Sequence, residues 1–326
     1  MRKVVVVCPG GGTTGGIELL HQLVDSLTNC NCSTVICYYP FYKNHKIPND
    51  YQKYRCAPIK YGEVDRENDV IILPEIYTYL VTRFRKAKVY VWWMSVDNYV
   101  NSSACKFAIK NMFLPWRYED ISSPKSHKRF AGHLYQSEYA RQFLLNHGIN
   151  IIHPLGDYVN EEYALRGRGV DCSKKKDIVV YNPNKGVERT YKLLPLLKNI
   201  DAVPIVGMAR SQVIALLASA KLYIDFGDHP GKDRMPREAA VMGCCVITNR
   251  KGSASNSVDI PIGDKYKLDD ECEDFETRAA NVIHEVIGNY AEHTQYFDVY
   301  RSLIAKEKKM FDKHVSELKC VFKCDA

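Results

Sequence analysis

A basic loop lies between a predicted buried strand and a predicted helix in the second half of the chain. An apolar run of strand length precedes the loop, which contains Gly231, Lys232 and Arg234. Pro236 suits the first turn of a helix, and we expect Glu238 in the same turn, where the helix dipole favours an acid. Lys232 and Arg234 therefore precede a helix N-terminus, whose free amides attract anions. The pattern indicates a phosphate site, and a solvated loop with two exposed cations is the alternative.

The same segment resembles the donor-sugar segment of GT-B glycosyltransferases, which are built from two Rossmann-like domains. Many retaining members have a Glu, a Gly-Phe-Gly-like loop, and a second Glu in a Pro-x-x-Glu-Ala helix. Residues 236–240 and Gly243 match the second half of that pattern, whereas the first Glu would fall at Pro230. The resemblance implies that Glu238 binds the ribose hydroxyls of a donor nucleotide.

Composition is consistent with this class of protein. A length of 326 residues suggests two domains, and the contents of 46% hydrophobic and 25% charged residues are typical of a globular protein. No apolar run reaches the roughly 18 residues of a membrane-spanning helix. Twelve cysteines without metal-like spacing indicate reduced thiols, so we expect a cytoplasmic protein. The net charge of +7 favours an anionic partner such as nucleotide phosphates or the inner face of a membrane.

Both halves of the chain alternate strands with helices, which predicts an α/β fold of two doubly wound parallel-sheet domains facing across a cleft. The predicted strands are 3–8, 34–38, 70–73, 89–93, 134–136 and 151–153 in the first half, and 177–181, 203–206, 222–226 and 244–248 in the second. We expect an acceptor-binding domain at 1–158, a Gly- and Lys-containing linker at 159–176, and a donor domain at 177–295. The remaining residues, 296–326, predict a helix that could return to the first domain.

Ligands of such sheets bind outside the C-terminal ends of the strands. Three basic turns of the second half follow predicted strands: Asn184-Lys185-Gly186, Arg210, and the loop 231–234. Lys185-Gly186 also resembles the Lys-Gly of the family, in which the Lys contacts the diphosphate, although alone it reads as a solvated turn. In the first half, the resemblance places Gly15 and Gly16, near the first predicted helix N-terminus, against the same diphosphate.

Two acids of the first half follow predicted strands and are expected at the same functional edge. If the enzyme inverts the anomeric centre, it needs a base, and Asp97 or Glu75 is the natural candidate. Basic residues mixed with aromatic ones at 106–130 suit a membrane interface as well as nucleic acid, and the resemblance favours a glycan or lipid-linked acceptor over nucleic acid. Residues 83–88 and the lysines at 306–313 are either similar contacts or solvated faces.

The chemistry requires stabilisation of a diphosphate leaving group, for which Lys185, Lys232 and Arg234 are our candidates and Arg210 a weaker one. The chain contains no Asp-x-Asp triplet, so we expect no essential metal and no cofactor beyond a UDP- or GDP-linked sugar. The resemblance implies a retaining glycosyltransferase of capsule or O-antigen synthesis. Two alternatives stay open: a nucleotide-sugar epimerase of the same fold, and a non-catalytic nucleotide-sugar-binding component of a glycan-assembly complex. A dehydrogenase is a weaker third, because the Gly10–Gly16 turn lacks an acidic partner.

Overall fold

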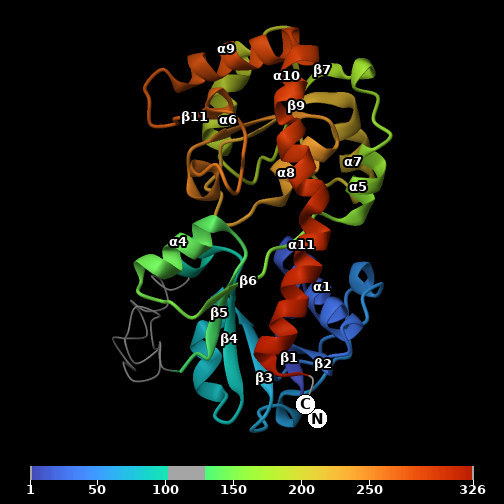
Figure 1. The fold of residues 1–326 in the computed structure, drawn as a ribbon. Coiled ribbons are helices and arrows are strands. Elements are labelled where there is room, and N and C mark those ends of the chain that lie inside the picture. The colour runs from blue at the N-terminus through green and yellow to red at the C-terminus, as the bar shows by residue number, and fades with distance from the viewer. Residues whose placement is uncertain (1, 102–128, 325–326) are drawn as a thin grey trace. The chain divides into compact units, whose positions relative to one another are not determined.

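The structure is a computed structural model that describes residues 2–101 and 129–324. The chain forms two compact units, which we call unit 1 (residues 1–157 and 309–326) and unit 2 (residues 158–308). Each unit contains a sheet whose described strands are all parallel (Figure 1).

Unit 1 contains a six-stranded sheet in the order β2-β1-β3-β4-β5-β6. The strands are β1 (Val4–Pro9), β2 (Thr34–Tyr39), β3 (Val70–Pro74), β4 (Lys88–Trp93), β5 (Gly132–Tyr135) and β6 (Ile152–Pro154). The valines that open β1 are fully buried, as expected of a strand with both faces covered. Because β1 connects to β2 on one side and lies beside β3 on the other, the strand order reverses between β1 and β3.

Unit 2 contains a five-stranded sheet in the order β11-β10-β9-β7-β8. The strands are β7 (Lys176–Tyr181), β8 (Asp201–Pro204), β9 (Ala220–Asp225), β10 (Cys245–Asn249) and β11 (Lys267–Leu268). Here the strand order reverses between β7 and β9, because β8 lies on one side of β7 and β9 on the other. Each of the ten predicted strands is confirmed to within two residues or so, and the two-residue strand β11 was not predicted.

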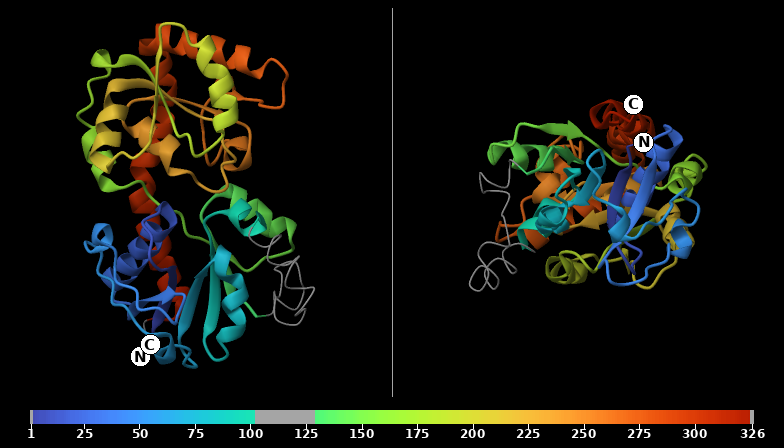
Figure 2. Two further views of the ribbon diagram at one scale, coloured as in Figure 1. Left: turned by 180° about the vertical axis from the view of Figure 1, so that it is seen from behind. Right: turned by 90° about the horizontal axis from the view of Figure 1, so that it is seen from below.

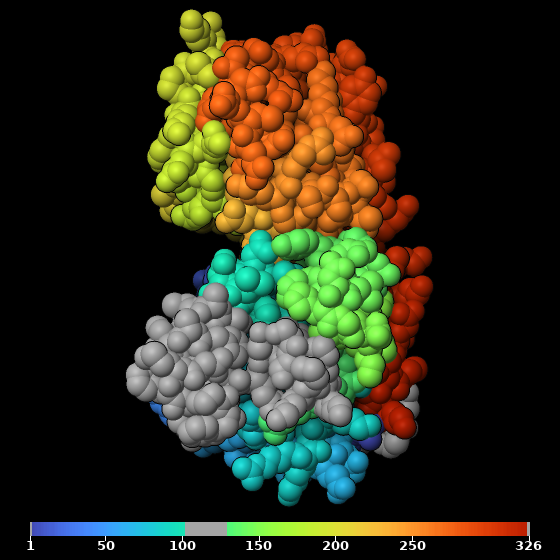
Figure 3. Space-filling view, turned by 90° about the vertical axis from the view of Figure 1, so that its left-hand side faces the viewer, coloured from blue at the N-terminus to red at the C-terminus, as the bar shows by residue number. Residues whose placement is uncertain are grey.

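Helices follow most strands. Unit 1 has α1 (Gly15–Asn29), the 3-10 segment η3 (Glu75–Arg83) and α4 (Glu138–Asn146); unit 2 has α5 (Glu161–Gly167), α6 (Val187–Leu193), α7 (Arg210–Ser219), α8 (Arg234–Val241), α9 (Phe275–Gly288) and α10 (Tyr290–His293). In unit 2, α6 packs with α9, and α5 packs with α7 and α8, so helices cover both faces of the sheet (Figures 1 and 2). The space-filling view shows α6 and α9 side by side, in yellow-green and orange (Figure 3).

Residues 159–176, which we expected to form a linker, instead belong to unit 2 and contain helix α5. Tyr163 of that helix is 4% exposed and is part of the hydrophobic core of unit 2. The long helix α11 (Asp298–Phe322) contributes its first residues to unit 2, whereas residues 309–326 belong to unit 1. Of the predicted segment 296–326, residues 296–308 thus belong to unit 2, where Tyr296, Val299 and Leu303 are exposed.

Candidate nucleotide site

The C-terminal edge of the unit 2 sheet brings together the turn after β7 and the loop after β9. Lys185 follows β7, and its Nζ donates to Oδ1 of Asp233, 2.8 Å away, at the start of α8. The contact joins residues 48 positions apart in sequence, at the point where the strand order reverses. Open α/β sheets bind ligands in the crevice at this position.

Gly186 holds the Lys185 turn close to β9. Its φ of +58° is in the left-handed region, and a Cβ added there would lie 2.2 Å from the carbonyl oxygen of Phe226. Only glycine permits both the backbone conformation and the close approach. Lys185 therefore stands at a fixed position beside the loop after β9.

The loop after β9 contains a buried group of charged residues that the sequence did not indicate. His229 is 0% exposed, and its Nδ1 lies 2.9 Å from Oδ2 of Asp233. Its Nε2 lies 3.2 Å from the carbonyl oxygen of Asp225 and 3.8 Å from that residue's carboxylate. Burial raises the pKa of Asp225, whereas His229 and Lys185 outweigh the effect of burial on Asp233 and lower its pKa. A search of the sequence for ionisable residues spaced four apart in this loop would have found the set.

The side chains of Asp225, His229 and Asp233 lie close enough together to raise the question of a metal site. Single ligand atoms of Asp225, His229 and Asp233 all lie within 4.8 Å of one another. However, Lys185 already binds one carboxylate of the set, and the two imidazole nitrogens each face a different Asp. The geometry fits a histidine bridge between two acids, stabilised by a lysine, better than a shared metal centre.

Helix α8 begins two residues earlier than predicted. Arg234 is its first residue and Asp233 its N-cap position, so Pro236 is the third helical residue and Glu238 lies beyond the first turn. The first turn contains no acid, and our placement of Glu238 there was wrong. The side chain of Asp233 does not cap the helix, because its carboxylate binds Lys185 and His229 instead. Arg234 is half-buried at the first turn, where we had expected it to precede the helix.

Lys232 lies in the loop after β9, beside Gly231, and its ammonium forms an ion pair with another side chain of the protein. Its Nζ lies 2.8 Å from Oε1 of Glu307 on α11, and Nη1 of Arg237 donates to the other oxygen of the same carboxylate at 2.8 Å. Arg237 also donates to the backbone oxygens of Lys232 and Asp233, at 2.9 and 3.0 Å. The buried guanidinium of Arg237 therefore fixes the backbone of the basic loop, and a phosphate that binds Lys232 must compete with Glu307.

Glu238 and Arg210 lie on the side of the sheet covered by α5, α7 and α8. Glu238 is 6% exposed, and its carboxylate accepts a hydrogen bond from Tyr163 of α5. Burial and the charge of Glu238 raise the pKa of Tyr163, and Arg210, the first residue of α7, opposes that shift. Tyr163, Glu238 and Arg210 thus lie close enough for their charges to interact. The sequence analysis had not indicated Tyr163 as a residue of this site.

A pocket of about 480 Å³ lies beside the turn after β7. It is lined by Gly186, Val187, Glu188, Arg189, Phe226, Asp228, Lys251, Asp270 and Glu271. Lys251 is paired with Asp270 at 2.8 Å, and Arg189 with Glu276 at 2.9 Å, so its cations are already engaged. Asn184 is exposed in the same turn.

In unit 1, Gly15 and Gly16 are the first two residues of α1, whereas we had expected them in the turn just before this helix. The Thr14 side chain accepts from the amide of Ile17 and caps the helix. A Cβ at Gly16 would meet nothing within 4 Å among the described residues, so packing does not require glycine there. This open first turn contrasts with Gly186, which the fold itself requires.

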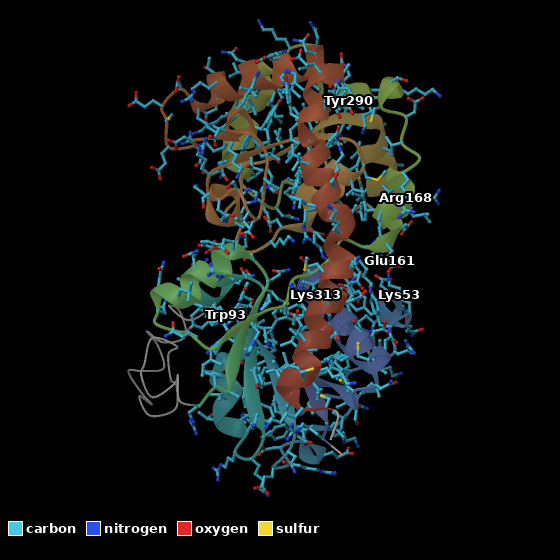
Figure 4. All side chains as sticks on the ribbon, in the orientation of Figure 1. Lys53, Trp93, Glu161, Arg168, Tyr290 and Lys313 are labelled. Atoms are coloured by element: carbon cyan, nitrogen blue, oxygen red, sulfur yellow. The ribbon has the colours of Figure 1, made fainter. Side chains whose placement is uncertain are left out.

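Glu75 and Asp97 occupy the C-terminal edge of the unit 1 sheet. Glu75 directly follows β3, is 3% exposed, and accepts from the amide of Met94 at 3.2 Å. Burial raises the pKa of Glu75 to about 7, in the range of a general base. Asp97 accepts from the hydroxyl of Tyr139 at 2.7 Å. Fully buried Trp93, labelled in Figure 4, ends β4 and donates to His133.

The basic and aromatic segments at 83–88, 106–130 and 306–313 lie partly within the described residues. Residues 106–128 lie outside the described residues. The cations expected at these segments are exposed, namely Arg83, Arg85, Lys86, Lys88, Lys306, Lys309 and Lys313. Phe311, which lies between the last two of these lysines, is buried and cannot contact lipid. Among the described residues, none of the helices has the length and apolarity needed to cross a membrane.

Comparisons with known proteins place the fold. No protein-family model and no curated protein matches the sequence. A glycosyltransferase from Rickettsia africae is 13% identical over 99% of this chain and 98% of its own, with a TM-score of 0.62. HepE of Anabaena, solved with UDP and glucose, is 9% identical over 98% and 99%, with a TM-score of 0.66. An alpha-glucosyltransferase solved with UDP and a 13-mer DNA is 11% identical over 96% and 99%, with a TM-score of 0.56.

These similarities extend over nearly the whole chain, and both units contain the parallel sheets that the resemblance implied. The chain has the GT-B glycosyltransferase fold.

Proposed function

We propose that this protein is a glycosyltransferase that moves a sugar from a UDP- or GDP-linked donor to a glycan or lipid-linked acceptor. The donor would lie at the C-terminal edge of the unit 2 sheet. The observation that carries the proposal is the meeting of Lys185 with the loop after β9 where the strand order reverses. The fold supports the same conclusion, since similar structures include an alpha-glucosyltransferase and HepE of Anabaena, both solved with UDP.

Within this site, Lys185 breaks its ion pair with Asp233 and binds the diphosphate instead. The first turn of α8, with Arg234, supplies amides and a cation to the same group. Lys232 assists when it exchanges Glu307 for phosphate. Glu238 binds the ribose and exchanges its bond with Tyr163 for the nucleotide hydroxyls, with Arg210 nearby.

We further propose that the reaction retains the anomeric configuration and needs no essential metal. Cations in place of a metal can stabilise the leaving diphosphate. An inverting reaction is the alternative, because Pro230 stands where the retaining members of the family that the sequence resembles have their first Glu. In addition, burial raises the pKa of Glu75 into the range of a base. We also propose a role in surface polysaccharide synthesis at the inner face of a membrane, which the net charge of +7 supports.

A glycan or lipid-linked glycan is our candidate acceptor. Because a similar alpha-glucosyltransferase was solved with DNA, nucleic acid belongs in the acceptor panel as a competing outcome. The non-catalytic alternative is favoured by one observation, namely that Lys185, Lys232 and Glu238 all have partners within the protein.

The test is an assay of nucleoside diphosphate release from UDP-glucose, UDP-galactose, UDP-N-acetylglucosamine and GDP-mannose. Each donor is offered with oligosaccharides, a lipid-linked sugar, DNA or no acceptor, with and without EDTA, and the product anomer is read by NMR. Acceptor-dependent release in EDTA supports the proposal. Interconversion of donor sugars without acceptor indicates the epimerase, and nucleotide binding without turnover of any donor indicates the non-catalytic component.

A further inference from the structure

His229 is both fully buried and conformationally strained. Its φ of +47° is in a region that residues other than glycine rarely adopt. The amide of Ser253 donates to its carbonyl oxygen at 2.9 Å, and a Cβ at Gly252 would lie 2.1 Å from that oxygen, so the neighbouring loop fixes the strained backbone. Strained residues held in place by their surroundings cluster at functional sites, which directs attention to this side chain.

The ring of His229 faces charged groups from three elements. Asp225 at the end of β9 lies beside Nε2, and Asp233 at the start of α8 lies beside Nδ1. Lys185, after β7, binds the second oxygen of Asp233 and is also near exposed Asp228. The loop after β10 contacts His229 through the backbone amide of Ser253. The hydroxyl of Tyr223 donates to Asp225 at 3.0 Å and adds no charge.

With both carboxylates ionised, the charges of this buried group balance only when the imidazole is protonated. Two carboxylates, Asp225 and Asp233, face one permanent cation, Lys185, so a neutral His229 leaves a net negative charge. A donor diphosphate that draws Lys185 away would meet an uncompensated Asp233, and buried unpaired charge is costly. A protonated His229 removes that obstacle, because it remains hydrogen-bonded to Asp233 after Lys185 has turned.

We propose that His229 is a positioning residue of the donor site: its imidazolium holds Asp233 so that Lys185 is released to the diphosphate. This inference rests on the proposed function. It assigns to His229 a role in donor affinity that does not require contact with the donor.

A pH dependence of binding follows. Burial opposes the charged ring, but the hydrogen bond to Asp233 and the charges of Asp225 and Asp233 outweigh it and raise the pKa of His229 above 6.5. Donor affinity should therefore be highest while the ring is protonated and fall as the pH rises through that pKa.

The test measures the Kd of UDP-glucose and GDP-mannose by calorimetry between pH 5.5 and 9, because the diester phosphates of these probes do not titrate in this range. His229→Asn is the main variant, since Asn accepts a positive φ. We expect binding about tenfold weaker than wild type at low pH, without the wild-type pH dependence.

Ser253→Ala is the control. It removes a 2.6 Å hydrogen bond to the carbonyl oxygen of Gly231, which lies in the same loop as His229, without changing any charge. It should weaken binding while keeping the pH midpoint. NMR titration of His229 in the free protein provides a readout that needs no ligand.

Three outcomes would overturn the inference alone: unchanged affinity in His229→Asn, an imidazole that titrates below 6.5, or donor binding that EDTA abolishes and Mn²⁺ restores through Asp225 and Asp233. If neither probe nor any nucleoside diphosphate binds wild-type protein, the proposed function itself fails, and this inference with it.

Discussion

The ammonium of Lys185 lies 2.8 Å from the carboxylate of Asp233, across the point where the strand order of the unit 2 sheet reverses. This ion pair joins the turn after β7 to Asp233, the N-cap position of α8, and it depends on Gly186 for its geometry. In the proposed site, a donor diphosphate would replace Asp233 as the partner of this cation.

Replacement of Gly186 by Ala should destabilise the protein by about 2–4 kcal/mol. The new Cβ would be 2.2 Å from the Phe226 carbonyl oxygen, in addition to the cost of a positive φ. Gly207→Ala is the control, because Gly207 has a φ of +62° but nothing within 4 Å, so it should cost only about 1–2 kcal/mol. Urea unfolding measures the free energy of unfolding of both variants. If both lose the same amount, the Phe226 carbonyl does not prevent a Cβ at position 186.

Gly16→Leu should leave stability unchanged or slightly higher, because the first turn of α1 has open space and Leu favours a helix. If the space beside Gly16 accommodates donor phosphates, the same variant should bind UDP-glucose at least tenfold more weakly. Gly62→Leu, at another glycine with open space, controls for added apolar surface. Normal UDP-glucose affinity in Gly16→Leu would remove Gly15 and Gly16 from the donor site.

Glu307→Ala should destabilise the protein by about 3–5 kcal/mol, because it leaves the buried guanidinium of Arg237 without its carboxylate. Glu317→Ala, on the same helix, removes an exposed ion pair with Lys313 and should cost less than about 1 kcal/mol. Urea unfolding distinguishes the two. A small loss at Glu307 would mean that Arg237 does not depend on this carboxylate to fix the basic loop.

Glu75 predicts a pH-dependent stability. Its pKa is raised from 4.5 to about 7 in the folded protein, so between these values the folded state keeps a proton that the unfolded chain has released. The free energy of unfolding of wild type should fall over that interval as the pH rises. Glu75→Gln removes this loss, so its stability relative to wild type should increase by on the order of 3 kcal/mol between pH 4.5 and pH 8.

Unfolding curves of the two proteins at several pH values measure this difference, with exposed Glu63→Gln as control. A constant difference between Glu75→Gln and wild type would contradict a buried carboxyl with a raised pKa. It would also remove the main argument for Glu75 as a base.

The strands were predictable because apolar runs of four residues or more are a local signal, as at 70–73 and within 177–181. The start of α8 could not be predicted in this way. The Asp233 side chain does not cap the helix, because it binds Lys185, which lies 48 positions away in the sequence. The segment 159–176 has the composition of a linker, yet Tyr163 is buried in unit 2, since packing outweighs local composition. Partners such as Glu307 for Lys232 come from distant elements and leave no trace in the local sequence.

The most direct test of the central claim is the affinity of UDP and GDP for Lys185→Ala, measured by calorimetry beside wild type and Lys198→Ala. Lys198 is an exposed lysine of the same unit and serves as the matched control. Charged hydrogen bonds are worth about 1.5–3 kcal/mol, so we expect roughly 10- to 100-fold weaker binding in Lys185→Ala. We expect wild-type affinity in Lys198→Ala. Equal affinity in all three proteins would contradict a diphosphate site at the meeting of β7 and β9.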